Sequence, residues 1–165
     1  MSFSFLHQQA LLETAESFRE YAAARQHPLV LDIEPGQMYN GDEYTLRQLT
    51  GILLENAVKY AAENSEIRFC LKKQKKGIFL TCENRCETLP ESHQADRLFD
   101  RFYRVDPSRN RKNGGFGIGL SIARNIAEAH RGSITAQILP DDKICFSVFL
   151  PEHGKSERKK IQPGG

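Results

Sequence analysis

Residues 55–60, Glu-Asn-Ala-Val-Lys-Tyr, bring a carboxylate, an amide and a cation close together in the chain. On a helix, Glu55, Asn56 and Lys59 share one face, because residues three and four apart are neighbours. An amide oxygen is a hard ligand that suits Mg²⁺ beside nucleotide phosphates, and a lysine can offset phosphate charge. The pattern is compatible with a magnesium and phosphate site, although taken alone it does not favour one over the plain alternative. A solvated helix with a simple Glu55–Lys59 ion pair is the alternative.

A glycine-rich stretch, residues 114–121 (Gly-Gly-Phe-Gly-Ile-Gly-Leu-Ser), leads straight into an expected helix. Glycines let backbone N–H groups approach a ligand closely, and a helix start adds partial positive charge, so this is phosphate-binding chemistry. The stretch is neither a Rossmann fingerprint, which would need glycine at position 120, nor a P-loop, which would need Gly-Lys-Ser/Thr. A flexible hinge is the alternative.

The segment before it, residues 104–113, is polar and basic. We interpret it as a lid that orders over a triphosphate and brings Arg104, Arg109, Arg111 or Lys112 near the γ-phosphate. A plain surface loop is the alternative.

Apolar residues at helical spacing predict the helices that would position these groups, over residues 10–25, 43–62 and 119–130. The expected buried stripe of the second helix comprises Leu46, Leu49, Leu53, Ala57 and Tyr60. His27-Pro28 should end the first helix, because the residue before proline disfavours the helical region.

Alternating apolar residues predict strands over residues 29–33, 67–71, 78–82, 133–139 and 144–150. Loops or turns are expected at residues 35–36, 40–41, 72–77 and 140–143. The last four strands fall into two hairpins. This arrangement predicts an α/β fold: a two-layer α/β sandwich with a mixed sheet and helices on one face.

The bulk composition fits one soluble globular domain, with 165 residues, 39% hydrophobic and 27% charged. A net charge of only +2 argues against a nucleic-acid partner. No apolar run approaches the roughly 20 residues that span a bilayer, and no signal peptide is expected at the start. We interpret Cys70, Cys82 and Cys145 as small buried hydrophobic residues in a reducing cytoplasm, with no disulfide or metal role.

Several stretches resemble the motifs of the catalytic domain of bacterial sensor histidine kinases. Residues 46–60, Leu-Arg-Gln-Leu-Thr-Gly-Ile-Leu-Leu-Glu-Asn-Ala-Val-Lys-Tyr, resemble its N box. Residues 98–109, Leu-Phe-Asp-Arg-Phe-Tyr-Arg-Val-Asp-Pro-Ser-Arg, resemble its F box, and residues 115–123, Gly-Phe-Gly-Ile-Gly-Leu-Ser-Ile-Ala, its G2 box. Residues 128–134 continue in the family's manner. The resemblance runs from about residue 3 to 150 and implies the Bergerat ATP-binding fold of the GHKL superfamily.

The resemblance also implies roles for single residues, with ATP and Mg²⁺ as cofactors. Asn56 would bind Mg²⁺, and Glu55 matches the acidic residue proposed to activate an acceptor histidine. Phe99 and Phe102 would anchor the lid. The positions that would contact the nucleotide are Asn56, Lys59, Tyr60, Asn84, Phe102, Arg104, Gly115, Gly117, Gly119 and Leu120.

The chain departs from the family pattern at the G1 box, usually Asp-x-Gly-x-Gly, where residues 84–88 read Asn-Arg-Cys-Glu-Thr. We expect Asn84 to take over the adenine contact of the aspartate, because an amide oxygen accepts the same N–H. The alternative is that Asn84 caps the strand end or starts a turn. Ile52 also stands where many relatives have a first asparagine. Both departures bear on nucleotide affinity more than on fold.

None of the five histidines lies in the family's phosphoacceptor pattern, His-Glu/Asp-x-Lys/Arg-Thr-Pro. The resemblance therefore implies that the acceptor lies on a separate dimerisation domain of the parent kinase, and that a response regulator receives the phosphoryl group next. His130 is expected to be structural.

We expect a catalytic domain over residues 1–150 and a polar, flexible tail over 151–165. It would lie in the cytoplasm without touching the membrane itself, its parent being anchored in a bacterial inner membrane. Two rivals remain: a degenerate module of the same fold that binds a partner protein with little or no ATP turnover, and a serine kinase of the anti-sigma type.

Overall fold

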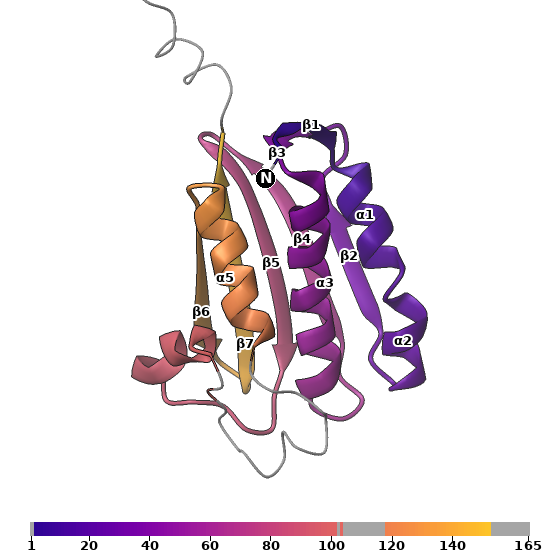
Figure 1. The fold of residues 1–165 in the computed structure, drawn as a ribbon. Coiled ribbons are helices and arrows are strands. Elements are labelled where there is room, and N and C mark those ends of the chain that lie inside the picture. The colour runs from indigo at the N-terminus through magenta and orange to yellow at the C-terminus, as the bar shows by residue number, and fades with distance from the viewer. Residues whose placement is uncertain (1, 102, 104–117, 153–165) are drawn as a thin grey trace, which may run out of the picture.

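A five-stranded mixed sheet forms one layer of the protein in a computed structural model, which describes residues 2–101, 103 and 118–152 (Figure 1). In spatial order the strands are β2 (Leu29–Ile33), β4 (Ile67–Gln74), β5 (Gly77–Arg85), β7 (Lys143–Pro151) and β6 (Ser133–Leu139). β2 pairs with β4 in parallel, and the other neighbours are antiparallel. The expected mixed sheet and its two hairpins are confirmed.

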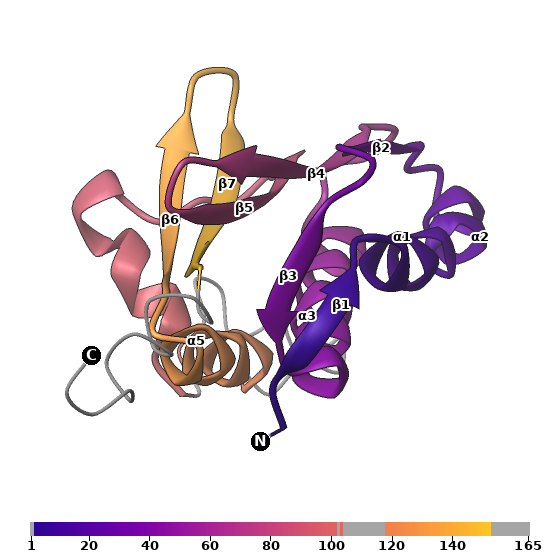
Figure 2. The ribbon, with the colours of Figure 1, turned by 90° about the horizontal axis from the view of Figure 1, so that it is seen from above.

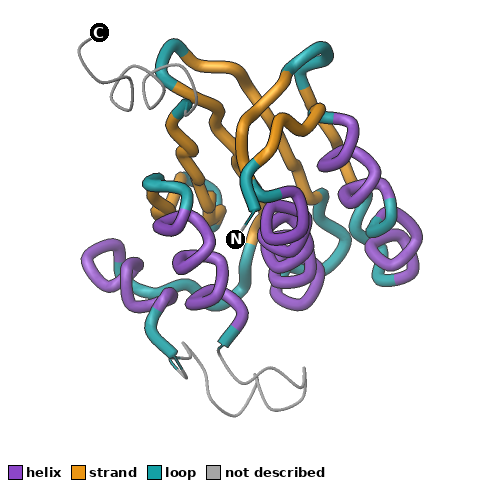
Figure 3. The backbone as a smooth tube through the Cα atoms, turned by 45° about the horizontal axis from the view of Figure 1, so that its top comes forward, coloured by secondary structure: helices purple, strands orange, loops and turns teal. Residues whose placement is uncertain are grey.

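The helices form the second layer and cover one face of this sheet (Figures 2 and 3). They are α1 (Gln9–Glu16), α2 (Arg19–Ala24), α3 (Glu43–Tyr60) and α5 (Gly119–Ala129), with a 3₁₀ helix, η1 (Ser92–Phe99). α3 and α5 lie side by side in opposite directions (Figure 1), so the C-terminal end of α3 and the N-terminal end of α5 meet at the lower end of that view. The two-layer α/β sandwich is confirmed.

The core lies between these layers. The predicted stripe of α3 is buried at Leu46, Leu49, Leu53 and Ala57, while Tyr60 is half-buried. On β5, side chains alternate between the two faces, so Ile78, Leu80, Cys82 and Asn84 all face the helices. The Cys82 thiol lies 3.7 Å from the Leu53 carbonyl oxygen of α3, which fixes this direction.

The single helix predicted over residues 10–25 is wrong, because the structure has two helices, α1 and α2. The break falls at Ser17 and Phe18. The Ser17 hydroxyl donates to the Thr14 carbonyl oxygen (2.6 Å), and the Phe18 N–H bonds three residues back to Ala15 (3.1 Å), a tighter turn than an α-helix. Apolar periodicity continues across such a break, so it did not reveal it.

The turn predicted at residues 40–41 is also wrong, because both residues belong to β3 (Met38–Gly41). β3 pairs antiparallel with β1 (Ser4–His7), a strand the sequence analysis did not predict. Gly41 is required for close approach: a Cβ there would lie 2.7 Å from the Tyr39 ring. The glycine therefore signals tight packing at this position and no turn.

The turn predicted over residues 72–77 is shorter than expected, because β4 runs to Gln74 and β5 starts at Gly77. Lys72 pairs with Asp32 (2.9 Å) and Lys73 with Glu152 (2.7 Å) across the sheet. At the other end of the chain, β7 runs through Pro151. Residues 153–165 lie outside the described residues, so the tail stays a prediction.

Candidate functional site

α3 is the element that carries the predicted chemistry. Asp42 caps its N-terminus by accepting a hydrogen bond from the Thr45 N–H (2.9 Å), and Glu43 lies in its first turn, where negative charge complements the helix dipole. Its apolar stripe faces the sheet. The opposite face of its C-terminal half is left for Glu55, Asn56 and Lys59, as the sequence predicted.

Those three residues lie together at the surface. Glu55 is exposed, whereas Asn56 and Lys59 are half-buried. The Lys59 ammonium lies 3.4 Å from a Glu55 carboxylate oxygen, the ion pair that was the alternative to a phosphate site. An exposed pair of this kind contributes only about 0.3–0.5 kcal/mol, so a triphosphate could displace it. The Asn56 side chain makes no hydrogen bond to any residue within the described ranges.

The chain leaving β5 joins the end of α3. Cys86 forms an isolated antiparallel bridge with Ala61, the residue that follows Tyr60, and the Ala62 N–H donates to the Arg85 carbonyl oxygen (2.8 Å). The N–H of Cys86 donates to the Asp142 carbonyl oxygen in the β6–β7 turn (2.8 Å). The segment that replaces the G1 box is therefore hydrogen-bonded to the end of α3 on one side and to the β6–β7 turn on the other.

Asn84 is a buried polar residue of this region, with 3% of its surface exposed. Its Nδ2 donates to the Arg85 carbonyl oxygen (2.9 Å) and to the Cys86 sulfur (3.2 Å). Its Oδ1 has no hydrogen-bond partner. Among the described residues, it is the one buried side-chain oxygen or nitrogen atom that lacks a partner. A buried acceptor without a donor costs about 1–3 kcal/mol, so this atom calls for an explanation.

α5 presents its N-terminus at the same end. No side chain caps the helix, and no acidic residue occupies its first turn, so the first backbone N–H groups keep their donor capacity and partial positive charge. Among the described residues, a Cβ at Gly119 would meet Ile52 of α3 at 3.5 Å, an ordinary contact. The described part of the chain therefore leaves room for a side chain at this position.

The C-terminal end of α3, the end of β5 and the N-terminal end of α5 lie at one end of the two layers (Figure 1). These three element ends carry seven predicted site residues: Glu55, Asn56, Lys59, Tyr60, Asn84, Gly119 and Leu120. The remaining predicted contacts, Phe102, Arg104, Gly115 and Gly117, lie outside the described residues, as do Arg109, Arg111 and Lys112 of the expected lid.

Comparisons with known proteins identify the family of this chain. A family profile described as "Histidine kinase-, DNA gyrase B-, and HSP90-like ATPase" matches residues 41–154. The chain belongs to this ATPase family, as a sensor histidine kinase catalytic domain.

Single relatives point the same way. The signal transduction histidine-protein kinase BaeS of Escherichia coli (strain K12) is 37% identical over 142 residues, which are 86% of this chain and 30% of that protein. The chain spans less than a third of the length of the curated relatives it matches.

The solved structures share the fold. The catalytic domain of the histidine kinase ThkA, in a nucleotide-free form, has a TM-score of 0.79 at 21% identity, over 92% of this chain and 97% of that one. A structure of ThkA in complex with the response regulator protein TrrA has a TM-score of 0.74 at 19% identity, over 92% of this chain and 42% of that one.

Within this histidine kinase domain, Phe99 anchors the end of η1. It is 3% exposed and packs edge-on against Phe146 of β7, with ring centroids 6.0 Å apart. The guanidinium of Arg124 on α5 lies 5.9 Å from the Phe99 ring centroid. η1 is thereby held against both layers immediately before the predicted lid.

All four cysteines are unbridged in the structure. No group of three or more histidine, cysteine or acidic side chains in the described ranges could hold a metal ion. Burial raises the pKa of Cys82, and it also raises the pKa of Cys145, so both stay thiols at neutral pH. No helix in the described part of the kinase domain has the length and apolar character needed to cross a membrane.

Sequence reasoning missed two contacts of this kinase domain. One joins Cys86 to Asn84, and no spacing rule could have revealed a thiol as a partner of an amide. The other joins His130 at the end of α5 to the Asp42 N–H at the start of α3 (3.0 Å). The structural role predicted for His130 agrees with this bond.

Proposed function

We propose that this domain binds Mg-ATP between α3 and the N-terminus of α5, and donates the γ-phosphoryl group to a histidine on a separate dimerisation domain. The observation that carries the proposal is the buried, unpartnered Oδ1 of Asn84 on the helix-covered face of the sheet. The exocyclic amino group of adenine is a donor that this acceptor lacks.

The phosphate end of the nucleotide would lie between Lys59 and the first turn of α5. Uncapped backbone N–H groups and the helix dipole attract phosphate, and Lys59 adds a full positive charge. Tyr60 and Leu120, both half-buried, would flank the nucleotide from the two helices.

Mg²⁺ would be held by the side-chain oxygen of Asn56 together with phosphate oxygens and water. The donor set fits, because Mg²⁺ keeps most of its waters and takes few protein ligands, and the Asn56 amide has no other partner within the described chain. The ion supplies charge neutralisation of the phosphates when bound.

Glu55 would accept the proton of the acceptor histidine as its nitrogen attacks the γ-phosphorus. Its exposure fits this role, because the acceptor arrives on another domain. The N–P bond forms as the bond from phosphorus to the β,γ-bridging oxygen breaks, which leaves ADP.

Calorimetric titration with ATP, with and without Mg²⁺, tests the nucleotide site. Asn56→Ala should abolish the magnesium-dependent part of binding without unfolding the domain, because the residue lies off the apolar stripe. Asn125→Ala, an exposed asparagine on α5, is the matched control and should bind as the parent does. Unchanged affinity in Asn56→Ala would rule out the metal role.

The partners follow from the same proposal. The ThkA–TrrA complex supports a response regulator as the final acceptor, and the family supports a cytoplasmic location with the parent kinase anchored in a bacterial inner membrane.

The chain alone should gain no acid-labile phosphate from labelled ATP. Adding the parent's histidine-bearing domain should restore labelling, and Glu55→Gln should remove it again. Acid-labile label on His130 of the isolated chain would contradict the proposal.

A degenerate module that binds a partner protein is the second candidate. Cys86 and Thr88 occupy the two glycine positions of the G1 box, and the Cys86–Ala61 bridge ties this segment to α3. A folded chain that shows no heat of ATP binding would favour this candidate.

A further inference from the structure

The amide of Asn84 has two different ends, and the end that faces the nucleotide decides which base it can read. Its oxygen can accept from the amino group of adenine, whereas its nitrogen could donate to the O6 carbonyl of guanine. An ionised carboxylate has no such ambiguity, because it only accepts. A chain with asparagine at this position needs contacts that fix the orientation of the amide.

Two contacts hold the nitrogen end. Nδ2 lies 2.9 Å from the Arg85 carbonyl oxygen and 3.2 Å from the Cys86 sulfur, which uses both of its hydrogens. A flipped amide would set Oδ1 against the Arg85 oxygen, and two acceptors at that distance repel. It would also lose the N–H···S bond. The orientation that leaves Oδ1, and not Nδ2, without a protein partner is therefore the favoured one.

The backbone of Cys86 is held without Asn84. Its N–H donates to the Asp142 carbonyl oxygen in the β6–β7 turn (2.8 Å), and Cys86 pairs with Ala61 at the end of α3. The residue is thus fixed at the junction of three elements, and its burial (8% exposed) restricts the side chain. A glycine, which the family usually has here, offers no side chain to hold an amide.

We propose that Cys86 is a positioning residue for base selection. Its sulfur, together with the Arg85 carbonyl oxygen, holds Asn84 with Oδ1 towards the nucleotide, so that the domain takes adenine nucleotides in preference to guanine nucleotides. The inference rests on the proposed adenine contact of Asn84.

The test is the ratio of ATP to GTP affinity, measured by calorimetry on the full 165-residue chain. Cys86→Ala removes one of the two anchors and should lower this ratio roughly two- to ten-fold, the value of one neutral hydrogen bond. Cys86→Val, which fills the thiol's space without an acceptor, should do the same. Cys86→Ser, which keeps an acceptor, should hold the ratio near the parent value.

Two controls separate base selection from a general effect on the fold. Cys70→Ala, a half-buried cysteine on the other face of the sheet, should leave the ratio unchanged. In an Asn84→Asp background, Cys86→Ala should also leave it unchanged, because a carboxylate has no orientation to fix. Thermal unfolding of each variant reports folding.

A ratio that stays at the parent value in both Cys86→Ala and Cys86→Val overturns the inference, while ATP binding through Asn84 stands. A drop of equal size in the Asn84→Asp background also overturns it, because the effect would then be general. If the folded parent binds neither nucleotide, the proposed function fails and this inference falls with it.

Discussion

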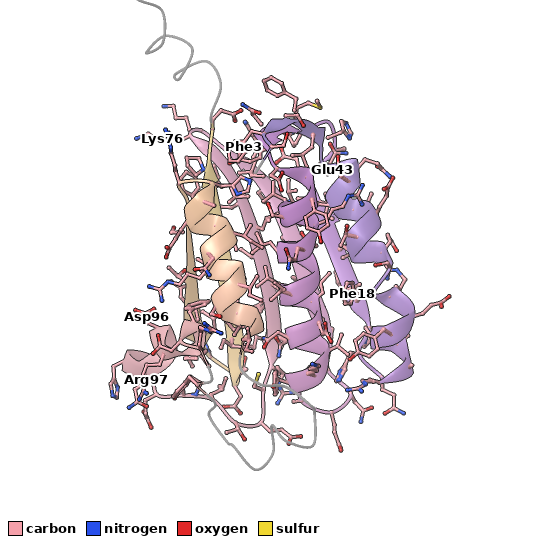
Figure 4. All side chains as sticks on the ribbon, in the orientation of Figure 1. Phe3, Phe18, Glu43, Lys76, Asp96 and Arg97 are labelled. Atoms are coloured by element: carbon pink, nitrogen blue, oxygen red, sulfur yellow. The ribbon has the colours of Figure 1, made fainter. Side chains whose placement is uncertain are left out.

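The two ends of the helix pair α3 and α5 treat their polar groups in opposite ways. At the upper end in Figure 4, where Phe3 and Glu43 are labelled, the polar groups of Asp42 and His130 are paired within the protein. At the lower end, where Asp96 and Arg97 are labelled, an acceptor of Asn84 and the first turn of α5 have no side-chain partner in the described chain. Paired polar groups stabilise a fold, and a buried polar group without a partner costs stability. The upper end is therefore the one built for stability, and the lower end is the one where we propose that the nucleotide binds.

The upper end is organised around His130, which is completely buried. Its Nε2 accepts from the Asp42 N–H (3.0 Å), so its Nδ1 carries the proton and donates to the Ile126 carbonyl oxygen (2.9 Å). The Asp42 carboxylate in turn accepts from the N–H groups of Ser2 (3.0 Å) and Thr45 (2.9 Å). One histidine thereby joins the start of α3 to the end of α5.

Removal of His130 should have the largest effect on stability. His130→Ala leaves a cavity and the Asp42 N–H without its partner, so we expect a loss of about 3–5 kcal/mol in the free energy of unfolding. Urea unfolding measures it. His93→Ala, at an exposed histidine of η1, should change stability by less than about 0.5 kcal/mol. A loss below about 1 kcal/mol in His130→Ala would mean that the upper end is not the stabilising one.

A glycine at each end allows the second test. A Cβ at Gly132, just after α5, would lie 2.0 Å from the Phe149 carbonyl oxygen, so Gly132→Ala should cost about 3 kcal/mol of stability. Gly119→Ala meets no such obstacle, so it should keep its melting temperature yet bind ATP several-fold more weakly. Thermal unfolding and ATP titration of the two variants give the contrast. Equal losses of stability would erase the distinction between the ends.

The stabilising layers were largely predictable from the sequence, because they rest on local patterns. The stripe of α3 and the alternation of β5 are periodicities within single elements. The β1–β3 ribbon was not predictable, since Leu6 pairs with Tyr39 across more than thirty residues of chain and neither segment has a strong pattern. The position of Asn56 on the surface face of α3 was predictable from helical spacing, whereas its metal role and the adenine contact of Asn84 stay predictions. The amide orientation of Asn84 was not predictable, because it depends on Cys86 and on the Arg85 carbonyl oxygen.

The adenine contact gives the third test, at the lower end. Asn84→Leu removes the acceptor and should weaken ATP binding by at least about ten-fold, or 1.4 kcal/mol, with GTP binding poor throughout. Asn84→Asp should hold or tighten ATP binding, because a charge-assisted hydrogen bond gains roughly 1 kcal/mol over a neutral one. The aspartate should lower the melting temperature, because one of its oxygens would face the Arg85 carbonyl oxygen. If Asn84→Leu binds ATP as well as the parent does, the adenine is read elsewhere.

The smallest expected effect comes from Asp42 and appears as a pH dependence. The hydrogen bonds from Thr45, followed by that from Ser2, lower the pKa of the Asp42 carboxyl in the folded state. A carboxyl with a lowered folded-state pKa adds stability above its unfolded pKa of about 4, and that stability is lost as the pH falls through the folded value. Asp42→Ala should therefore cost about 1 kcal/mol of stability at pH 7, the usual value of an N-cap.

Asp42→Asn keeps an acceptor for the Thr45 N–H but cannot titrate, so at pH 7 its stability should be closer to the parent's than that of Asp42→Ala. Its stability should also fall less than the parent's between pH 7 and pH 3. Urea unfolding of the three proteins at both pH values measures this. An equal fall in Asp42→Asn and the parent would show that the upper end owes none of its acid sensitivity to this carboxylate.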